Sequence, residues 1–222
     1  MITVTQAVQQ RHSVRAFLPE PVDHEVIEQI LDTAARAPSG GNLQPWHVDV
    51  VAGDALETLK AKVGERLKEG LETTEFHVYP AELDVIHAGR RRACGEDLYD
   101  SIGIARDDKP ARWRQFLRNY DLFGAPVGLF FSIERSFDRP QWVHLGMFMQ
   151  TIMLLAEERG FGTCAQESWA AVHGTVSEFL GLPGDRIFYA AIALGRRDGA
   201  HPVNKFRTSR EPVAGFARFH GV

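Results

Sequence analysis

The segment from Pro140 to Arg159 constrains the fold most, because it has the length of a helix and is apolar nearly all round. Pro140 suits the first turn of a helix, and Gly160 is suited to end it. A helix without a polar face needs cover on more than one side, from the same chain or from a partner. Its apolar residues are Val143, Leu145, Met147, Phe148, Met149, Ile152, Met153, Leu154 and Leu155.

Short apolar runs on both sides of this helix predict the strands of a sheet. Residues 127–133 and 186–194 are rich in β-branched and aromatic side chains, which is typical of buried strands. Residues 47–51 alternate in a β-like way, and 163–167 reads as a short strand. With 44% hydrophobic residues in 222, the chain has enough apolar surface to bury a core of this kind.

Capping signals and apolar periodicity predict helices around these strands. Thr3 opens a short helix that ends near Arg11. Asp23 caps a second helix, which Pro38 ends, and Asp54 caps a third. A further helix runs up to Leu180. The mixture predicts an α+β fold.

Two segments show weaker periodicity. Proline and glycine interrupt residues 70–124, in which 83–99 and 112–120 have helical character. We interpret 70–124 as a helical excursion, or lid, belonging to a single domain that spans 1–222. The tail from Arg196 to Val222 carries Phe206, Phe216 and Phe219, and such a tail is expected to pack on something.

Composition excludes several classes of function. The net charge is −4, and no basic stripe with interleaved aromatics is present, so nucleic acid is not an expected partner. The longest apolar stretch, Leu145 to Ala156, is too short for a bilayer, and the start of the chain lacks a signal pattern. Cys94 and Cys164 form no C-x-x-C pair, and the nine histidines show no ligand spacing, so no metal site is expected. We expect a cytoplasmic protein.

The run Arg11-His12-Ser13-Val14-Arg15 is the first candidate binding element. Guanidinium groups and a hydroxyl at a helix end are the donors that a phosphate dianion prefers. The alternative is a solvated helix end whose cations complement the helix dipole.

The turn from Pro38 to Trp46 is the second candidate. Ser39, Asn42 and Gln44 offer polar side chains, and the glycines between them allow a close approach of backbone to ligand. A plain helix-to-strand connection would explain the proline and the glycines, but less well the crowding of polar side chains. Together the two candidates suit a ligand with a phosphate at one end and a flat, hydrogen-bonding ring at the other. FMN fits this description, and the leading hypothesis is therefore a flavin oxidoreductase.

These residues also carry a resemblance. The chain resembles the FMN-dependent nitroreductase family across nearly its whole length, and is most similar to its nitrobenzoate-reductase-like branch. Five matching stretches occur in the right order, and they are residues 11–15, 37–46, 123–128, 160–164 and 203–212.

The resemblance implies a central, mostly antiparallel sheet flanked by helices, and a homodimer with FMN at the subunit interface. The C-terminal segment would be exchanged with the partner subunit. Residues 38–44 would reach the other subunit's flavin, and the backbone at 166–168 would face flavin N5 and O4. The implied cofactor-binding residues are Arg11, His12, Ser13, Arg15, Pro38, Ser39, Gly40, Asn42, Gln44, Asn119, Gln166, Glu167, Ser168, Lys205, Arg207 and Arg210.

The implied chemistry is hydride transfer from NAD(P)H through FMN to a small aromatic acceptor, a nitroaromatic or a quinone, in a ping-pong cycle. Arg15 would lie at the pyrimidine edge and stabilise the reduced, anionic flavin. Its alternative role is that of one more phosphate ligand. Which of Lys205, Arg207 and Arg210 contacts the phosphate stays open, as does the choice between NADH and NADPH.

Other activities remain alternatives. Similar chains perform reductive dehalogenation, enone reduction or flavin fragmentation, and a flavin-binding module without turnover is a further possibility. Residues 90–92, all arginine, suit an acidic aromatic acceptor, although such a run is more often a solvated helix face.

Overall fold

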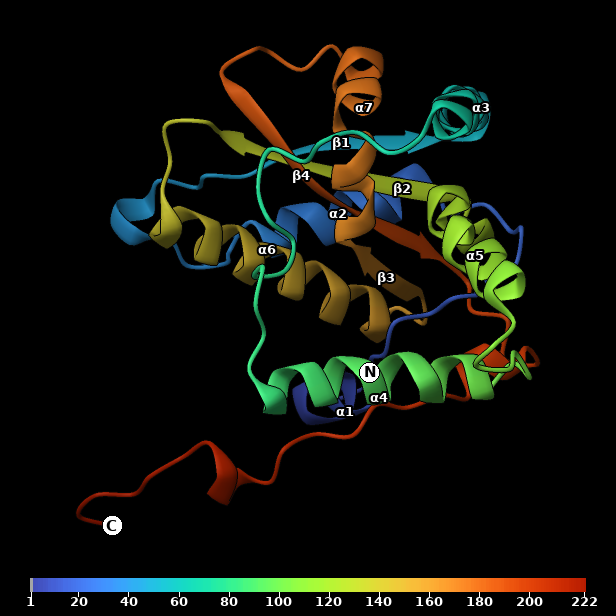
Figure 1. Cartoon of the computed structure of the whole chain (residues 1–222). Helices are drawn as coiled ribbons and strands as arrows, with labels where there is room; N and C mark the ends of the chain where they lie inside the picture. The colour runs from blue at the N-terminus through green and yellow to red at the C-terminus, as the bar shows by residue number, and fades with distance from the viewer. Residues whose placement is uncertain (1) are drawn as a thin grey trace.

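A four-stranded antiparallel sheet forms the centre of the computed structural model, which describes residues 2–222. The spatial order of the strands is β1 (His47–Ala52), β2 (Val127–Glu134), β4 (Arg186–Gly195), β3 (Gly162–Gln166). All four strands occur where the sequence predicted them, and the α+β class is confirmed (Figure 1).

Helices cover both faces of this sheet, and each face has its own apolar core. On one face, α2 (His24–Ala34) and α6 (Arg139–Glu158) pack on residues such as Leu129 and Ile192. On the other, α3 (Gly53–Glu69), α7 (His173–Leu180) and the 3-10 turn η3 (Glu167–Val172) pack around Phe130 and Trp169. β2 and β4 lie inside the sheet and are buried from both sides, which explains their near-continuous apolar sequences.

Helix starts and ends differ from the predictions at a few positions. The capping box at Thr3 is confirmed, and it opens α1 (Val4–Gln10). The prediction that α2 continues to Pro38 is wrong, because the helix ends at Ala34 and a turn connects it to the proline. Asp54 lies in the first turn of α3 rather than at its cap.

The helix that is apolar on all sides, α6, is covered on only part of its circumference. Leu145, Phe148 and Ile152 are buried against the sheet and α2. Val143 and Met147 point away and are 56% and 42% exposed. The chain therefore supplies part of the cover that α6 needs.

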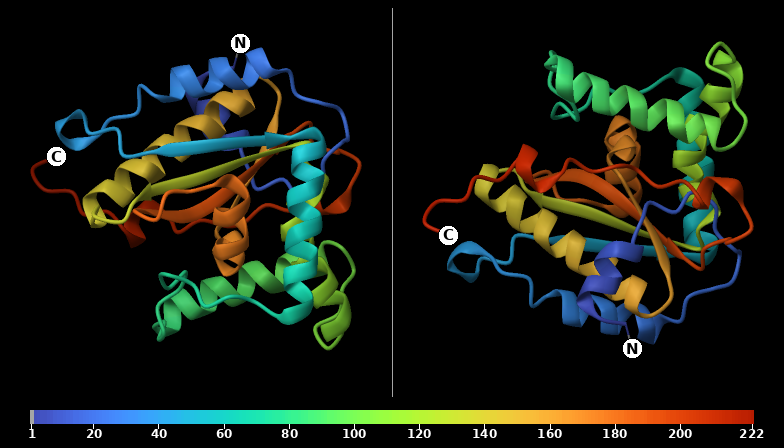
Figure 2. Two further views of the ribbon diagram at one scale, coloured as in Figure 1. Left: turned by 90° about the horizontal axis from the view of Figure 1, so that it is seen from above. Right: turned by 90° about the horizontal axis from the view of Figure 1, so that it is seen from below.

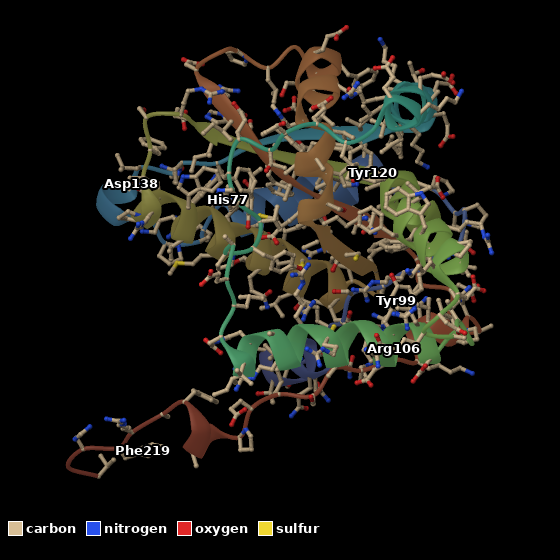
Figure 3. All side chains as sticks on the ribbon, in the orientation of Figure 1. His77, Tyr99, Arg106, Tyr120, Asp138 and Phe219 are labelled. Carbon is tan, nitrogen blue, oxygen red and sulfur yellow. The ribbon has the colours of Figure 1, made fainter. Side chains whose placement is uncertain are left out.

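Two segments extend from the body of the molecule. Residues 70–124 contain α4 (Val85–Asp100), α5 (Lys109–Leu117) and the 3-10 segment η2 (Arg118–Gly124). Figure 2 shows α4 standing away from the sheet, and the described side chains of this helix include none that is buried. The C-terminal segment also runs outward, and its Phe216 and Phe219 are 71% and 70% exposed (Figure 3). Among residues 2–222, no helix is both long and apolar enough to cross a membrane.

Candidate functional site

The segment after α1 docks beside β3, and this contact positions the first candidate element. The backbone N–H of Val14 donates to the carbonyl of Thr163 at 2.9 Å, and Ser13 forms a parallel bridge with Thr163. Gly162 permits this approach, because a Cβ there would lie 2.7 Å from Cγ2 of Val14. The contact aligns residues 13–15 with the start of β3.

Asn204 holds the same segment from its other side. Its buried side-chain carbonyl accepts from the backbone N–H of Arg15 at 2.8 Å, and its amide donates to the carbonyl of Ala16 at 2.8 Å. The guanidinium of Arg15 donates to the carbonyl of Ser13 at 3.2 Å. The C-terminal segment thereby fixes the conformation of residues 11–15, here called the phosphate loop.

Cations from both ends of the chain gather at this point. Burial lowers the pKa of the Arg11 guanidinium, and the charge of Arg210 lowers it further. Burial likewise lowers the pKa of the His12 imidazole, with a further contribution from Arg207. The positive charges of these two tail arginines therefore act on residues 11 and 12, and like charges around one point favour an added anion.

One carboxylate offsets part of this positive charge. Glu157, at the end of α6, is 7% exposed and accepts two bonds of 2.6 Å from the Arg197 guanidinium. Its charge also acts on Arg11 and His12. One carboxylate among several cations leaves the cluster with net positive charge.

The ring of His12 leaves one nitrogen available. Nδ1 lies 3.0 Å from the carbonyl of Gln10, so it is the donor of that bond. Nε2 is buried, and among residues 2–222 it has no hydrogen-bond partner. A buried polar atom without a partner is costly, and an anion oxygen in the cluster would satisfy a protonated Nε2.

A cavity of about 540 Å³ opens at the end of β3, where the chain turns into η3. Asn119 connects residues at this cavity. Its backbone carbonyl accepts hydrogen bonds from Nε2 of Gln166 at 2.8 Å and from Nε1 of Trp169 at 2.9 Å. Oε1 of Gln166 and Oγ of Ser168 are buried and unpaired within the described chain. The lining residues, of which Tyr120 is labelled in Figure 3, are Val78, Tyr79, Phe116, Asn119, Tyr120, Met149, Ala165, Gln166, Glu167, Ser168, Ala171, Tyr189 and Ala190.

A β-bulge brings Tyr189 to this cavity. Phe131 pairs with Ala190 and Ser132 pairs with Phe188, so Tyr189 is the extra residue of β4. Its hydroxyl donates to Oε1 of Glu167 at 2.7 Å. Burial raises the pKa of Tyr189, and the Glu167 carboxylate raises it further, so the phenol stays protonated and holds this carboxylate in place.

The loop of residues 38–44 lies elsewhere. The backbone N–H of Gly40 donates to Nε2 of His144 in the second turn of α6, at 3.3 Å. Glu157 marks the opposite end of the same helix, about 20 Å away at 1.5 Å per residue (Figure 1). Within one chain, Arg11, His12, Ser13 and Arg15 therefore lie far from the loop that contains Pro38, Ser39, Gly40, Asn42 and Gln44.

Comparison with known proteins identifies the family of the chain. The model of the nitroreductase family matches residues 8–196. The chain belongs to the nitroreductase family. Two curated relatives are the 4-nitrobenzoate reductase of Pseudomonas putida, at 36% identity over 96% of this chain and 94% of that protein, and the nitrobenzene nitroreductase of Ectopseudomonas oleovorans, at 34% over 97% and 96%.

Solved structures of the family superpose over the whole chain. The FMN and NADPH-dependent nitroreductase NfnB from Sphigopyxis sp. strain HMH has a TM-score of 0.96 at 41% identity, with 100% of both chains covered. NfnB from Mycobacterium smegmatis, solved in complex with NADPH, has a TM-score of 0.92 at 29% identity, with 97% of each chain covered. The expected nitroreductase-like fold is confirmed.

Several residues of the site are not apparent from the sequence. Tyr189 reaches the cavity only because of the bulge, and no sequence signal marks that bulge. Glu157 and Arg197 meet across 40 residues. A glutamate in the last turn of a largely apolar helix is a weak signal that could have pointed to Glu157. Lys205, Arg207 and Arg210 are all exposed, but only the two arginines act electrostatically on Arg11 or His12, which favours them as the tail cations.

The lowered pKa of His12 predicts a pH dependence of stability in the protein without cofactor. The unfolded chain has the ordinary histidine value of 6.5, so below that pH it binds a proton that the folded state resists. Stability should therefore fall as the pH drops below about 6.5. His12→Asn keeps a donor toward Gln10 but cannot titrate, so it should reduce this fall in the urea midpoint, whereas His220→Asn in the exposed tail should not. Equal slopes for all three proteins would contradict the assignment.

Proposed function

We propose that this chain is an FMN-dependent nitroreductase that uses NAD(P)H to reduce small nitroaromatic or quinone acceptors. One observation carries the proposal: two complementary sites lie along the same strand, β3. One is a cation cluster with a buried His12 nitrogen that has no partner among residues 2–222, and the other is a cavity lined by aromatic and polar side chains. Thr163 lies at the cation cluster and Gln166 lines the cavity. The two residues are three positions apart in β3, which corresponds to about 10 Å. That spacing suits a phosphate joined to a flat ring by a short polyol chain.

The residues present fit FMN in their chemistry. Guanidinium groups and the Ser13 hydroxyl are suited to the phosphate. The unpaired Oε1 of Gln166 and Oγ of Ser168 are suited to the polar edge of a flavin ring. The fit rests on the donor set and on buried atoms that need partners.

Each residue then has a proposed task. Arg11, Ser13 and either Arg207 or Arg210 would bind the phosphate, with His12 completing the shell. Arg15 would stabilise negative charge at the pyrimidine edge, and Glu167 would present its backbone to N5 while Tyr189 holds its side chain. When bound, FMN supplies the hydride transfer chemistry.

A single cavity is proposed to serve both substrates in turn. Its rings, among them Phe116, Tyr120 and Tyr189, suit a flat nicotinamide as well as a flat acceptor. Sequential use of one cavity corresponds to a ping-pong cycle. Residues 70–124 are the proposed lid, because they contribute several lining residues of this cavity, from Val78 at one end of the segment to Tyr120 at the other.

We also propose that two copies complete the site as a homodimer. Val4, Val8, Val143 and Met147 leave apolar surface exposed on α1 and α6, and the aromatic tail reaches away from its own chain. Because residues 38–44 lie about 20 Å from the cluster of their own chain along α6, a second copy is the proposed source of that loop. Sedimentation velocity should give twice the mass of one chain, and a monomer that binds FMN tightly would contradict this arrangement.

Purification tests the function directly. The protein should carry flavin absorbance and oxidise NADH or NADPH in the presence of 4-nitrobenzoate or menadione. A yellow protein that turns over neither acceptor would be a flavin-binding module. A colourless protein that does not bind added FMN would remove the assignment altogether.

Arg15→Ala tests the electronic role of this residue. If its charge stabilises the reduced flavin, the midpoint potential of the bound cofactor should become more negative, by about 30 mV for each 1.4 kcal/mol lost in a two-electron couple. Reductive titration with a reference dye measures this shift. An unchanged potential together with weaker FMN binding would instead make Arg15 a phosphate ligand.

A further inference from the structure

Residues 71–79, here called the strap, connect α3 to α4 and form one wall of the cavity. Figure 1 shows the strap in teal, crossing in front of β4 and descending past α6 to α4, and Figure 3 labels His77 within it. Val78 and Tyr79 line the cavity directly. The strap has no regular secondary structure, so side-chain contacts must hold it in place.

Glu72 makes the strongest of these contacts. Its carboxylate accepts from the backbone N–H of Gly174 at 2.6 Å, from that of Thr175 at 3.2 Å and from the Thr175 hydroxyl at 2.9 Å. These donors belong to the first turn of α7, where free N–H groups and the helix dipole favour a carboxylate. Residue 174 is glycine, and a Cβ there would lie 3.0 Å from Oε2 of Glu72.

Further contacts continue along the strap. The backbone N–H of Glu72 donates to the carbonyl of Ala171, which itself lines the cavity, at 2.8 Å. Glu75 pairs with Arg135 at 2.8 Å. His173 contacts the carbonyl of Thr73 at 3.1 Å. The first half of the strap is thus bound to α7 and to the end of β2.

Phe76 connects these anchors to the cavity. Its ring centre lies 5.6 Å from that of Trp142 on α6 and 5.7 Å from that of Tyr189. Tyr189 is the bulged residue whose hydroxyl holds Glu167. The strap therefore supports the part of the cavity lining that contains Tyr189.

The helix that follows the strap is held less firmly. Arg91 of α4 stacks on Tyr79 with its guanidinium carbon 4.0 Å from the ring centre, and Arg90 pairs with Glu211 at 2.6 Å. Both pairs are largely exposed and worth little individually. The position of Val78 and Tyr79 hence depends on the anchors before them rather than on α4.

We propose that the strap is the wall that determines affinity for aromatic acceptors and that Glu72 is its positioning residue. Glu72 does not touch the acceptor; it fixes the segment that carries Val78 and Tyr79 to the cavity. The proposal rests on the proposed function of this cavity. A small acceptor would fit within this cavity of about 540 Å³, whereas the adenosine half of the larger NAD(P)H would extend beyond it, so loosening the strap should weaken acceptor binding more.

Glu72→Gln tests the proposal in the FMN-loaded protein. The amide keeps one oxygen but loses the charge that strengthens its bonds to α7. We expect the KM for 4-nitrobenzoate to rise about 10-fold, equivalent to about 1.4 kcal/mol. We expect kcat and the FMN affinity to change less than about twofold and the KM for NADPH less than about threefold. The dissociation constant of benzoate, a non-reducible probe followed by flavin absorbance, should rise with the acceptor KM.

Glu69→Gln is the matched control. Glu69 and Glu72 both pair with Arg66, at 2.6 and 3.4 Å, but Glu69 lies on exposed α3 surface and makes no contact with the strap. It should leave every parameter unchanged. Val78→Ala keeps all anchors and alters the wall itself, so it should also weaken benzoate binding, even if Glu72→Gln does not fold.

The outcomes separate cleanly. Unchanged benzoate affinity in both Glu72→Gln and Val78→Ala would overturn the proposal. A parallel loss of FMN affinity, kcat and acceptor affinity in Glu72→Gln would also overturn it, because Glu72 would then be a general stability residue. Faster amide exchange at residues 71–79 in Glu72→Gln, together with weaker benzoate binding, would support it. Failure of the wild-type protein to bind FMN would instead be a failure of the proposed function.

Discussion

Arg11→Gln should raise the FMN dissociation constant by about 10- to 150-fold. The guanidinium lies half-buried beside Arg210, at the position where the cluster favours an anion. A hydrogen bond to a charged group contributes about 1.5–3 kcal/mol, and every 1.4 kcal/mol is a factor of ten in affinity. Titration of the protein without cofactor, followed by flavin fluorescence, measures the change.

Lys205→Gln is the control for this prediction. Lys205 is an exposed cation of the same tail, as Arg207 and Arg210 are, but it is not among the charges that perturb Arg11 and His12. Its replacement should change FMN affinity less than about twofold. Removing Arg11 also relieves repulsion from Arg210, so the cofactor-free variant should be at least as stable as the wild type. Wild-type affinity in Arg11→Gln would exclude the cluster as the phosphate site.

Gly162→Ala should weaken both the fold and the site, although it adds only one methyl group. The new Cβ would lie 2.7 Å from Cγ2 of Val14, closer than side-chain atoms can approach. Overpacking of this kind typically costs about 1–3 kcal/mol. Because Val14 lies between Ser13 and Arg15, its displacement should also move the phosphate loop and reduce FMN affinity. Urea unfolding and FMN titration measure the two effects.

A second substitution distinguishes this clash from other causes. Val14→Ala removes the methyl groups that the new Cβ would meet. The double variant, Gly162→Ala with Val14→Ala, should therefore recover most of the stability and FMN affinity that Gly162→Ala alone loses. Gly146→Ala, in α6 where a Cβ would meet no atom within 4 Å, should be tolerated. No recovery in the double variant would show that the glycine is needed for a reason other than Val14.

Local signals in the sequence were sufficient for most of the fold. The strands at 127–133 and 186–194 are confirmed because burial on both faces requires continuous apolar residues, and that pattern is local. The helix at 140–159 is also confirmed, because a long apolar run between Pro140 and Gly160 is a local signal too. The end of α2 was misplaced, since Pro38 excludes helix at the residue before it but does not require helix up to that point.

For the candidate site, the sequence by itself determined which functional side chains must lie close together. Arg11, His12, Ser13 and Arg15 lie within five residues, so any fold that presents one presents the others nearby. The amides at 39–44 share a turn for the same reason. The chemistry of an anion site and of a hydrogen-bonding loop is therefore readable without coordinates.

Only the tertiary structure decided how these groups combine. It brings the charges of Arg207 and Arg210 to act on His12 and Arg11, pairs Glu157 with Arg197, and turns Tyr189 into the cavity through a one-residue bulge. It also sets residues 38–44 about 20 Å along α6 from the cluster of their own chain. Each of these relations depends on strand register and helix packing between residues far apart in the chain, and no local pattern of side chains encodes such distances.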